Sequence, residues 1–351
     1  MISQNAQKHA EACRFCWMCR HLCPIGLKTG REINTPRAKG LLLSLVARGS
    51  AFDADMAQAM YECMLCDACT NDCATGFEPP LYIREARTQA LVEGIAPPAV
   101  EAVLARLEES GNIYGEAKPV YGSQEKAEVL LLVGEVAACR APHMVESYLR
   151  LLQKAGVSVM TLAQEPPTGA MLGDLMGYTQ EVRQQAATCA KAIDGSGAKT
   201  LVVLDSADAA LIRQQWPEWG VTAGVQVVTA TAFLWSLAEA GKLQFAPLGR
   251  TGCYHDDSRA ARALLAAAGV ELREMFLTKA LAKCCGSSLA NAYMPDITKK
   301  TAQGRWEDAL RTGAQMMVTS SPQSLEVLQL AVPATMELWD LYTLLDSACR
   351  S

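Results

Sequence analysis

Eight of the fourteen cysteines lie in two short stretches near the amino terminus. CRFCWMCRHLCP runs from Cys13 to Pro24, and CMLCDACTNDCA runs from Cys63 to Ala74. Each stretch has the spacing C-x2-C-x2-C-x3-C, in which three thiolates on one tight loop can reach three corners of an iron-sulfur cubane. The fourth corner must be held from elsewhere. The two stretches therefore predict a pair of [4Fe-4S] clusters.

The fourth cysteine of each stretch indicates how the clusters would be held. In two-cluster ferredoxins this cysteine ligates the other cluster. By that rule the predicted ligands of the first cluster are Cys13, Cys16, Cys19 and Cys73. The predicted ligands of the second cluster are Cys63, Cys66, Cys69 and Cys23. Crossed ligands would hold the clusters close together, which suits electron tunnelling.

Zinc and disulfides are the alternatives for so many cysteines. Zinc prefers two cysteine pairs separated by a longer loop, and disulfide frameworks belong to small secreted chains. Neither alternative explains four cysteines within eleven residues, repeated with the same spacing. Because cluster ligands must remain thiolates, the cysteines also favour a reducing compartment.

Composition and charge limit the function classes. A chain of 351 residues predicts two or three domains. The first residues are polar, and the longest apolar run, 129–133, is too short to cross a bilayer. We expect a cytoplasmic protein, either free or held at the inner face of a membrane by a partner. A net charge of −5 argues against nucleic acid as a partner.

The charges are unevenly distributed around the two loops. Residues 1–50 carry eight Lys or Arg and two acidic residues, whereas residues 51–100 carry two Arg and eight acidic residues. Positive charge near a cluster stabilises its reduced form. Two interpretations stay open: the clusters differ in potential, or the charges are only solvated helix faces.

Helix signals surround both loops. Thr35-Pro36, Asp53 or Asp55, Pro79-Pro80 and Pro97-Pro98 are helix-start signals, and Gly94 and Gly111 are stops. We therefore predict an α-helical ferredoxin-like domain with two clusters over residues 1–110. A polar, glycine-rich linker follows over 111–126.

From residue 127 the pattern changes to short apolar runs alternating with amphipathic segments, which is typical of a parallel sheet. Strands are expected near 129–133, 157–162, 200–204 and 225–228. The pattern then recurs, because LLQKAGVSVM and GAKTLVVLDSADAALI are echoed by LLAAAGVELRE and GAQMMVTSSPQSLEVL at nearly one offset. We predict a duplicated α/β unit, with repeats at 127–245 and 246–351. The tail, 334–349, is predicted as one closing helix.

The two loops, Pro36-Arg37, Tyr254-His255-Asp256 and Cys284-Cys285-Gly286 closely resemble a known family. Its members are the iron-sulfur subunits of glycolate oxidase, anaerobic glycerol-3-phosphate dehydrogenase, lactate-utilisation complexes and heterodisulfide reductase. The resemblance spans almost the whole chain. It implies a two-cluster domain followed by a Cys-Cys-Gly domain, and a partner flavoprotein dehydrogenase that carries FAD or FMN.

In that family, each half of the repeat offers a cysteine after a Tyr-His-Asp turn, then Cys-Cys-Gly, then a C-x2-C pair, and this set can bind a further cluster. This chain departs from the pattern. The first half reads PTGAMLGDLMGY and DSADA at the corresponding places, and serines replace three thiols of the second half. A third site at Cys253, Cys284 and Cys285 stays open, beside the alternative that these are buried packing residues.

No nucleophile with a matching base, paired carboxylates or dinucleotide motif is found. We therefore predict a non-catalytic electron-transfer subunit of an oxidoreductase complex. It would pass electrons from the flavoprotein to a quinone, a flavin or a ferredoxin. The alternatives are a heterodisulfide-reductase-like catalyst at Cys253, Cys284 and Cys285, and a purely structural assembly platform.

Overall fold

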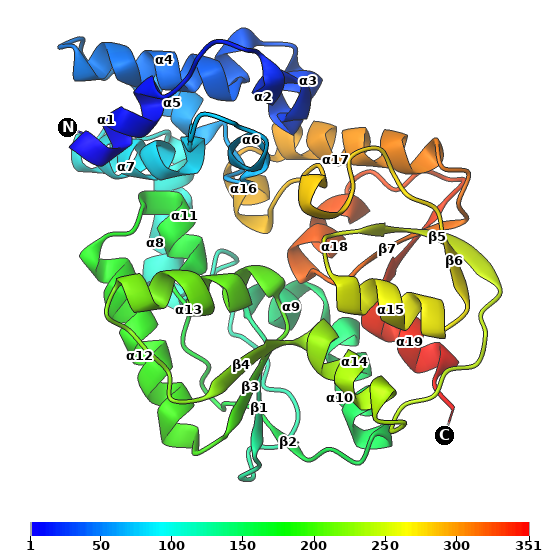
Figure 1. The fold of residues 1–351 in the computed structure, drawn as a ribbon. Coiled ribbons are helices and arrows are strands. Elements are labelled where there is room, and N and C mark those ends of the chain that lie inside the picture. Colours follow the sequence, from blue (N-terminus) through cyan, green and yellow to red (C-terminus); the bar gives the residue numbers. More distant parts are fainter. Residues whose placement is uncertain (1, 351) are drawn as a thin grey trace. The chain divides into compact units, whose positions relative to one another are not determined.

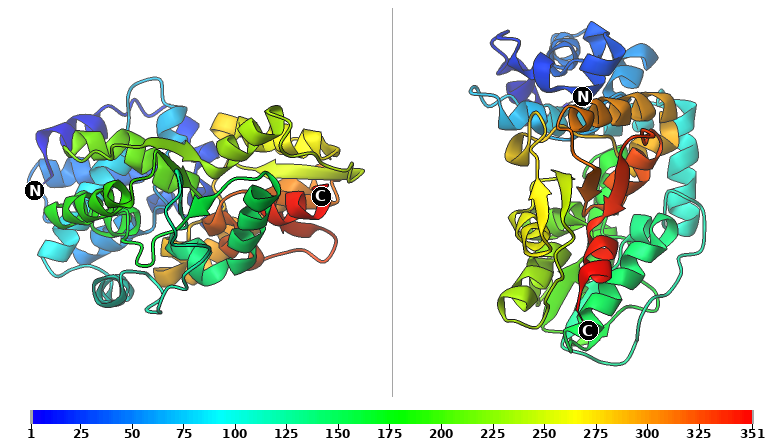
Figure 2. Two further views of the ribbon diagram at one scale, coloured as in Figure 1. Left: turned by 90° about the horizontal axis from the view of Figure 1, so that it is seen from below. Right: turned by 90° about the vertical axis from the view of Figure 1, so that its right-hand side faces the viewer.

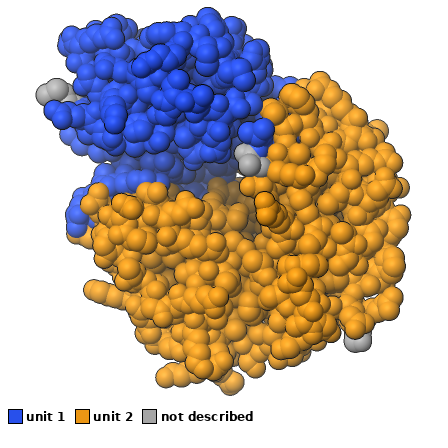
Figure 3. Space-filling view, viewed as in Figure 1, with its two compact units in different colours: residues 1–115, 171–182, 280–305 blue, residues 116–170, 183–279, 306–351 orange. Residues whose placement is uncertain are grey.

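The computed structural model describes residues 2–350, except for the side chain of Ala280. These residues form two compact units, drawn in blue and orange in Figure 3. Unit 1 consists of residues 1–115, 171–182 and 280–305. Unit 2 consists of residues 116–170, 183–279 and 306–351.

Capping side chains begin two helices of unit 1 where the sequence predicts them. Thr35 accepts a hydrogen bond from the Ala38 amide at 3.3 Å, and Asp53 accepts one from the Met56 amide at 2.9 Å. Such caps satisfy amides that have no partner within the helix. The amino-terminal helices are α1 (Gln4–Glu11), α2 (Met18–Leu22), α3 (Pro24–Thr29), η1 (Glu32–Asn34), α4 (Pro36–Ala47), α5 (Ala54–Tyr61), α6 (Ala68–Asn71), α7 (Pro79–Val92) and α8 (Pro98–Ser110).

The first sheet of unit 2 is entirely parallel, with the strand order β2-β1-β3-β4. Its strands are β1 (Val129–Leu132), β2 (Val159–Met160), β3 (Thr200–Val203) and β4 (Gln226–Thr229). All four lie where the alternating pattern predicts them. The helices between them are α9 (Glu135–Arg140), α10 (Pro142–Lys154), α11 (Ala170–Met176), α12 (Gln180–Ser196), α13 (Ser206–Glu218) and α14 (Ala230–Glu239).

The second sheet repeats this topology in the order β6-β5-β7-β8, again entirely parallel. Its strands are β5 (Arg250–His255), β6 (Val270–Leu272), β7 (Met316–Thr319) and β8 (Glu337–Asp340). The helices are α15 (Arg259–Ala267), η2 (Lys279–Leu281), α16 (Ser288–Tyr293), α17 (Pro295–Leu310), α18 (Pro322–Gln329) and α19 (Leu341–Ala348). The predicted fold class, a helical ferredoxin-like region followed by a duplicated parallel α/β unit, is confirmed.

One apolar core joins the two sheets of unit 2. Helices α10 and α14 of the first repeat pack against α15 and α19 of the second, between the sheets (Figures 1 and 2). The rings of Tyr148 and Tyr342 meet edge to face with centroids 4.9 Å apart. At the rim, Arg150 pairs with Asp346 at 2.7 Å. The two repeats therefore fold as one body.

Two segments of the repeats belong to unit 1. Residues 171–182 lie in α11 and the start of α12, and residues 280–305 include α16 and most of α17. Each segment follows the second strand of its own sheet. The predicted domain ranges place both segments in the repeats. The duplicated unit thus contributes two corresponding segments to the unit that holds the cysteine loops.

The prediction of a single closing helix over 334–349 is wrong in its first half. Glu337–Asp340 forms β8, which pairs in register with β7, and α19 begins only at Leu341. The Asp340 side chain caps α19 by accepting from the Thr343 amide at 2.8 Å. Pairing with a neighbouring strand outweighs the helical spacing of the apolar residues, because local propensity is weak against tertiary contacts.

Across residues 2–350, no helix combines the length and the apolar composition that crossing a bilayer requires. Helix α12, with 17 residues, has a charged and polar sequence, QEVRQQAATCAKAIDGS.

Candidate iron-sulfur centres

The two cysteine loops share one backbone conformation. The residues on either side of the second cysteine of each motif, Cys16 or Cys66, have positive φ. The values are 56° and 71° at Phe15 and Trp17, and 50° and 57° at Leu65 and Asp67. Left-handed residues other than glycine are uncommon and persist only where the surroundings require them. In each loop this winding brings an amide to 3.4 Å from a sulfur, that of Cys13 or of Cys63. The sequence repeat is therefore also a repeat of geometry.

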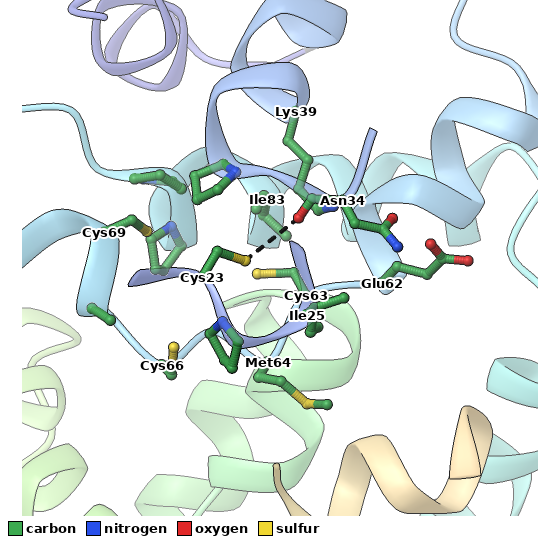
Figure 4. Close-up of a pocket in the computed structure, with 15 residues that line it drawn as sticks. Cys23, Ile25, Asn34, Lys39, Glu62, Cys63, Met64, Cys66, Cys69 and Ile83 are labelled. Carbon is green, nitrogen blue, oxygen red and sulfur yellow. Dashed lines mark hydrogen bonds between the residues drawn. The ribbon is translucent and has the colours of Figure 1, made fainter. Parts of the chain in front are cut away.

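The second loop encloses a pocket of unit 1, drawn in Figure 4. The thiols that line it are those of Cys23, Cys63, Cys66 and Cys69. Cys23 comes from the other motif, where its Sγ accepts from the Gly26 amide at 3.4 Å and donates to the Asn34 carbonyl at 3.5 Å. Apolar side chains, among them those of Ile25 and Ile83, form much of the remaining wall. These four cysteines are the set predicted for the second cluster.

The first loop borders a second pocket of unit 1. The thiols that line it are those of Cys13, Cys16, Cys19 and Cys73, together with Cys69. The first four are the set predicted for the first cluster. Cys73 is held by Thr75, whose hydroxyl lies 3.3 Å from its Sγ and donates to the Ala12 carbonyl at 3.0 Å. Because Cys69 lines both pockets, the two four-thiol sets are neighbours.

The protonation of these thiols indicates what the pockets require. Burial raises the pKa of Cys23 to about 12 and that of Cys19 to about 11. Burial also raises the pKa of Cys63 and Cys69. Bound metal ions would offset the charge of such thiols and stabilise their thiolate form.

Sets of four thiols fit a four-iron cubane. Within residues 2–350, no three His, Cys, Asp or Glu side chains converge as they would on one metal ion. A cubane differs from a single ion because its ligands are spread over four irons. The donor atoms of both pockets therefore suit a cluster.

Two buried cations lie beside the second loop. Lys39 is 1% exposed and lines the pocket of the second loop (Figure 4), and its Nζ donates to the Ile33 carbonyl at 3.2 Å. Burial lowers the pKa of Lys39. Arg87 is also 1% exposed and donates to the Cys63 carbonyl at 2.6 Å. Glu62 lines the same pocket and is 6% exposed. Lys39 and Arg87 therefore place basic side chains beside the second loop, although residues 51–100 as a whole are acidic.

The later segments of unit 1 contact helix α7 and the second loop. Arg84 pairs with the Asp174 carboxylate at 2.8 Å, and the Thr88 hydroxyl donates to the Met176 carbonyl at 2.6 Å. From the other segment, the Tyr293 hydroxyl donates to the carbonyl of Tyr61 at 3.2 Å, just before Cys63. The sequence patterns did not reveal these contacts, because they join residues about ninety and more than two hundred positions apart.

The three cysteines proposed for a third site lie in different parts of the fold. Cys284 and Cys285 belong to unit 1, whereas Cys253 lies in β5 of unit 2 and donates to the Met316 carbonyl at 3.6 Å. The Cys284 thiol contacts Cys66, and this hydrogen bond raises the pKa of Cys66. A third site at these cysteines stays a prediction.

Three carboxyl groups that the sequence analysis did not single out lie at the carboxyl end of the first sheet. Glu165 accepts from the amides of Val133 and Gly134 at 2.7 and 2.8 Å. Asp205 and Asp208 stand in DSADA, with the two-residue gap of the missing C-x2-C pair. Burial raises the pKa of Glu165 and Asp205, and burial with the nearby Asp205 charge raises the pKa of Asp208 to about 7. A D-x2-D pair after a strand was the available signal.

Replacing Asp208 with asparagine should remove a pH dependence of stability. The folded-state pKa is raised, so the native state binds the proton more tightly, and its stabilisation falls as pH rises from about 4 to about 7. We expect the wild type to lose on the order of 2 kcal/mol of unfolding free energy between pH 5 and pH 8, and Asp208→Asn to lose much less. Urea unfolding at both pH values measures this change. An equal loss of unfolding free energy in the wild type and Asp208→Asn would contradict the prediction.

Comparisons with known proteins match both halves of the chain. Residues 9–77 match the 4Fe-4S dicluster domain, and residues 248–325 match the cysteine-rich domain. The first range contains all eight cysteines of the two pockets, and the second contains Cys253, Cys284 and Cys285. Both matches are those that the cysteine motifs predict.

Relatives are similar over most of the chain. It is 22% identical over 353 residues to a subunit of the dihydromethanophenazine:CoB--CoM heterodisulfide reductase of Methanosarcina barkeri, covering 89% of this chain and 86% of that protein. It is 25% identical over 310 residues to a probable membrane-anchored ferredoxin of Chromohalobacter salexigens, covering 79% of this chain and 46% of that protein.

A hypothetical protein from Helicobacter pylori shares the fold. Its crystal structure matches with a TM-score of 0.60 at 10% identity, over 99% of this chain and 73% of that chain. The chain thus contains a match to the 4Fe-4S dicluster domain followed by a match to the cysteine-rich domain, and over most of its length it is similar to a subunit of a heterodisulfide reductase, as the sequence resemblance predicts.

Proposed function

We propose that this chain is a non-catalytic electron-transfer subunit of a multi-subunit oxidoreductase and holds two [4Fe-4S] clusters. The observation that carries the proposal is the pair of neighbouring four-thiol pockets in unit 1, with Cys69 lining both. Clusters bound there would supply two one-electron carriers within one folded unit. The chain's own residues supply thiolates, amides aimed at sulfur and buried positive charge.

The thiols that line each pocket support the ligand sets that the two motifs predict. For the first cluster we propose Cys13, Cys16, Cys19 and Cys73. For the second cluster we propose Cys63, Cys66, Cys69 and Cys23. In both sets the fourth ligand comes from the other motif, so loss of either motif would affect both clusters.

The proposed partner is a flavoprotein dehydrogenase that carries FAD or FMN, with a quinone, another flavin or a ferredoxin as acceptor. The relative from Methanosarcina barkeri is named as a subunit of a reductase, which supports a complex. We place the protein in the cytoplasm, either free or at the inner face of the membrane through a partner. The similarity to a protein named as a membrane-anchored ferredoxin supports the second arrangement.

Anaerobic purification of the native complex tests the proposal. We expect about eight irons and eight sulfides per chain, a flavin-containing companion, and two interacting electron paramagnetic resonance (EPR) signals after reduction with dithionite. Material that is colourless, or that carries zinc in place of iron, would refute it. A Cys66→Ser variant that assembles and turns over at the wild-type rate would instead favour a structural platform.

A second candidate function, a heterodisulfide-reductase-like catalyst at Cys253, Cys284 and Cys285, is supported by one contact. The Cys284 thiol lies against Cys66, a proposed ligand of the second cluster. A catalyst would need a further metal centre, so clearly more than about eight irons per chain would support it. Iron content that is unchanged in Cys284→Ala would favour the relay.

Lys39→Met should lower the midpoint potential of the second cluster by tens of millivolts. A buried positive charge stabilises the reduced, more negative form of a nearby cluster. An EPR-monitored redox titration measures the shift, and Lys8→Met, which changes an exposed lysine of α1, is the control. A second-cluster potential that does not move, in protein with full iron content, would show that Lys39 has no such role.

A further inference from the structure

The two cysteine loops differ in how they are covered, although their backbones match. In the second loop Met64, Leu65 and Ala68 are 8%, 6% and 8% exposed. The corresponding residues of the first loop are Arg14, Phe15 and Met18, and Phe15 and Met18 are 51% and 54% exposed. The apolar side chains of the second loop are therefore covered, whereas Phe15 and Met18 of the first loop are exposed.

The position directly after Cys16 or Cys66 also differs between the two loops. It is Asp67 in the second loop and Trp17 in the first, with φ of 57° and 71°, and Trp17 is 41% exposed. A charged side chain is the ordinary choice for an exposed position, whereas exposed aromatic and methionine side chains gathered on one loop mark interaction sites. Cys16, between Phe15 and Trp17, is exposed, as is Cys66 in the second loop, so the contrast lies in the side chains beside the cysteine.

The cover of the second loop comes from unit 1 itself. Met64 packs with Ile25, Ala290 and Met294. Leu65 packs in the cluster formed by the amino-terminal helices. The structure thus shows what covering such a loop requires, namely apolar surface supplied by another segment.

Arginines surround the exposed loop. The guanidinium of Arg37 lies 3.8 Å from the ring centroid of Trp17, and that of Arg20 lies 5.3 Å from it. Arg20 and Arg37 share one acidic neighbour, Glu32, at 3.8 and 3.2 Å. Arg14 is exposed as well. With eight basic and two acidic residues, 1–50 is the basic part of a chain whose net charge is −5.

We infer that the loop from Arg14 to Arg20 is the docking surface for an acidic flavoprotein, which exchanges electrons with the chain beside Cys16. Aromatic residues, methionine and arginine are enriched at protein interfaces, and opposite charge speeds association. Charge complementarity selects the partner, because a basic apolar surface suits an acidic redox protein. This inference rests on the proposed function and adds which loop meets the partner.

A loop transplant tests the inference. Phe15→Leu, Trp17→Asp and Met18→Ala together give the first loop the residues of the second at three of the four differing positions, and Arg14 is kept. The second loop adopts the same left-handed conformations, so the backbone of the first loop should be retained. The control, Val92→Asp, adds the same charge at an apolar residue that is 78% exposed at the end of α7. Iron content and the EPR spectrum establish that both variants hold their clusters.

Two reductants separate docking from reducibility. Flavodoxin hydroquinone is an acidic protein donor, and photoreduced deazaflavin is a small donor that needs no docking surface. Each electron that flavodoxin gives up oxidises its flavin by one electron and reduces one cluster by one electron. Stopped-flow rates are measured at low and high salt.

We expect the transplant to react with flavodoxin at least about tenfold more slowly than wild type and with deazaflavin at the same rate, while Val92→Asp matches wild type with both. Wild-type rates with flavodoxin should fall as salt rises. Equal flavodoxin rates in transplant and wild type, a wild-type rate that ignores salt, or an equal loss in Val92→Asp would overturn the inference. So would a transplant that only converts a dimer to a monomer, because the loop would then bind a second copy.

Failure of the proposed function is distinguishable from failure of this inference. A chain that lacks iron, or that neither donor reduces, contradicts the electron relay. If both donors reduce the chain at rates that the transplant does not change, the electron relay is supported and only the docking surface is refuted.

Discussion

The double variant Cys16→Ala, Cys73→Ala should keep one intact cubane, whereas Cys16→Ala, Cys23→Ala should keep none. With crossed ligands, Cys16 and Cys73 serve the same cluster, so removing both spares the other. Cys23 serves the second cluster, so the other pair damages both. Iron and sulfide content of anaerobic protein, together with EPR after reduction, measures the difference.

The same pair of variants excludes the uncrossed arrangement. If each motif held its own cluster with all four of its cysteines, the outcomes would be exchanged, and Cys16→Ala, Cys23→Ala would retain the intact cubane. Cys139→Ala is the matched control, because Cys139 is a half-buried cysteine on α9 of unit 2 and should leave about eight irons per chain. Equal iron in both double variants would contradict crossed and uncrossed ligation alike.

Replacing Arg87 with methionine should lower the free energy of unfolding by about 4 kcal/mol and release the second cluster first. The Arg87 guanidinium donates to the carbonyls of Met60, Tyr61 and Cys63, and to that of Asp174. These carbonyls lie where α5 leads into the second loop and where residues 171–182 reach it. Removing the cation takes this donor from all four carbonyls, because methionine fills the space but cannot donate. The Tyr61 carbonyl keeps the Tyr293 hydroxyl as a donor.

Arg84→Met is the matched control for Arg87→Met. Arg84 lies one turn earlier on α7 and pairs with the side chain of Asp174, which is 41% exposed. Its loss should cost about 1 kcal/mol and leave the iron content unchanged. Urea unfolding and iron content measure both variants. A similar loss in the two would show that Arg87 does not organise the second loop.

The parts of the fold that were predicted correctly depend on local chemistry. A cubane requires closely spaced thiolates, so the motif C-x2-C-x2-C-x3-C can be recognised from the sequence without any knowledge of the tertiary structure. Thr35 and Asp53 mark helix starts because capping is decided within four residues. The parallel sheets follow from apolar runs that recur with helices between them.

The parts that could not be predicted depend on distant contacts. Nothing near residues 171–182 or 280–305 indicates that they leave the repeats for unit 1. The sequence pattern places Trp339 in a helix, whereas in the structure it lies in β8, which pairs with the distant strand β7. Counting charges along the chain assigns Lys39 to the first loop, whereas its side chain lines the pocket of the second. In each case a neighbour far away in the sequence decides the outcome.

The cover of the second loop has a consequence for biosynthesis. Met64 and Cys23 pack against Ala290, Met294 and Cys284, which a ribosome makes more than two hundred residues after the loop itself. A nascent chain therefore displays this pocket to the solvent until translation is almost complete. Iron and sulfide can be delivered during that interval, before the segment that contains Ala290 and Met294 packs against the second loop.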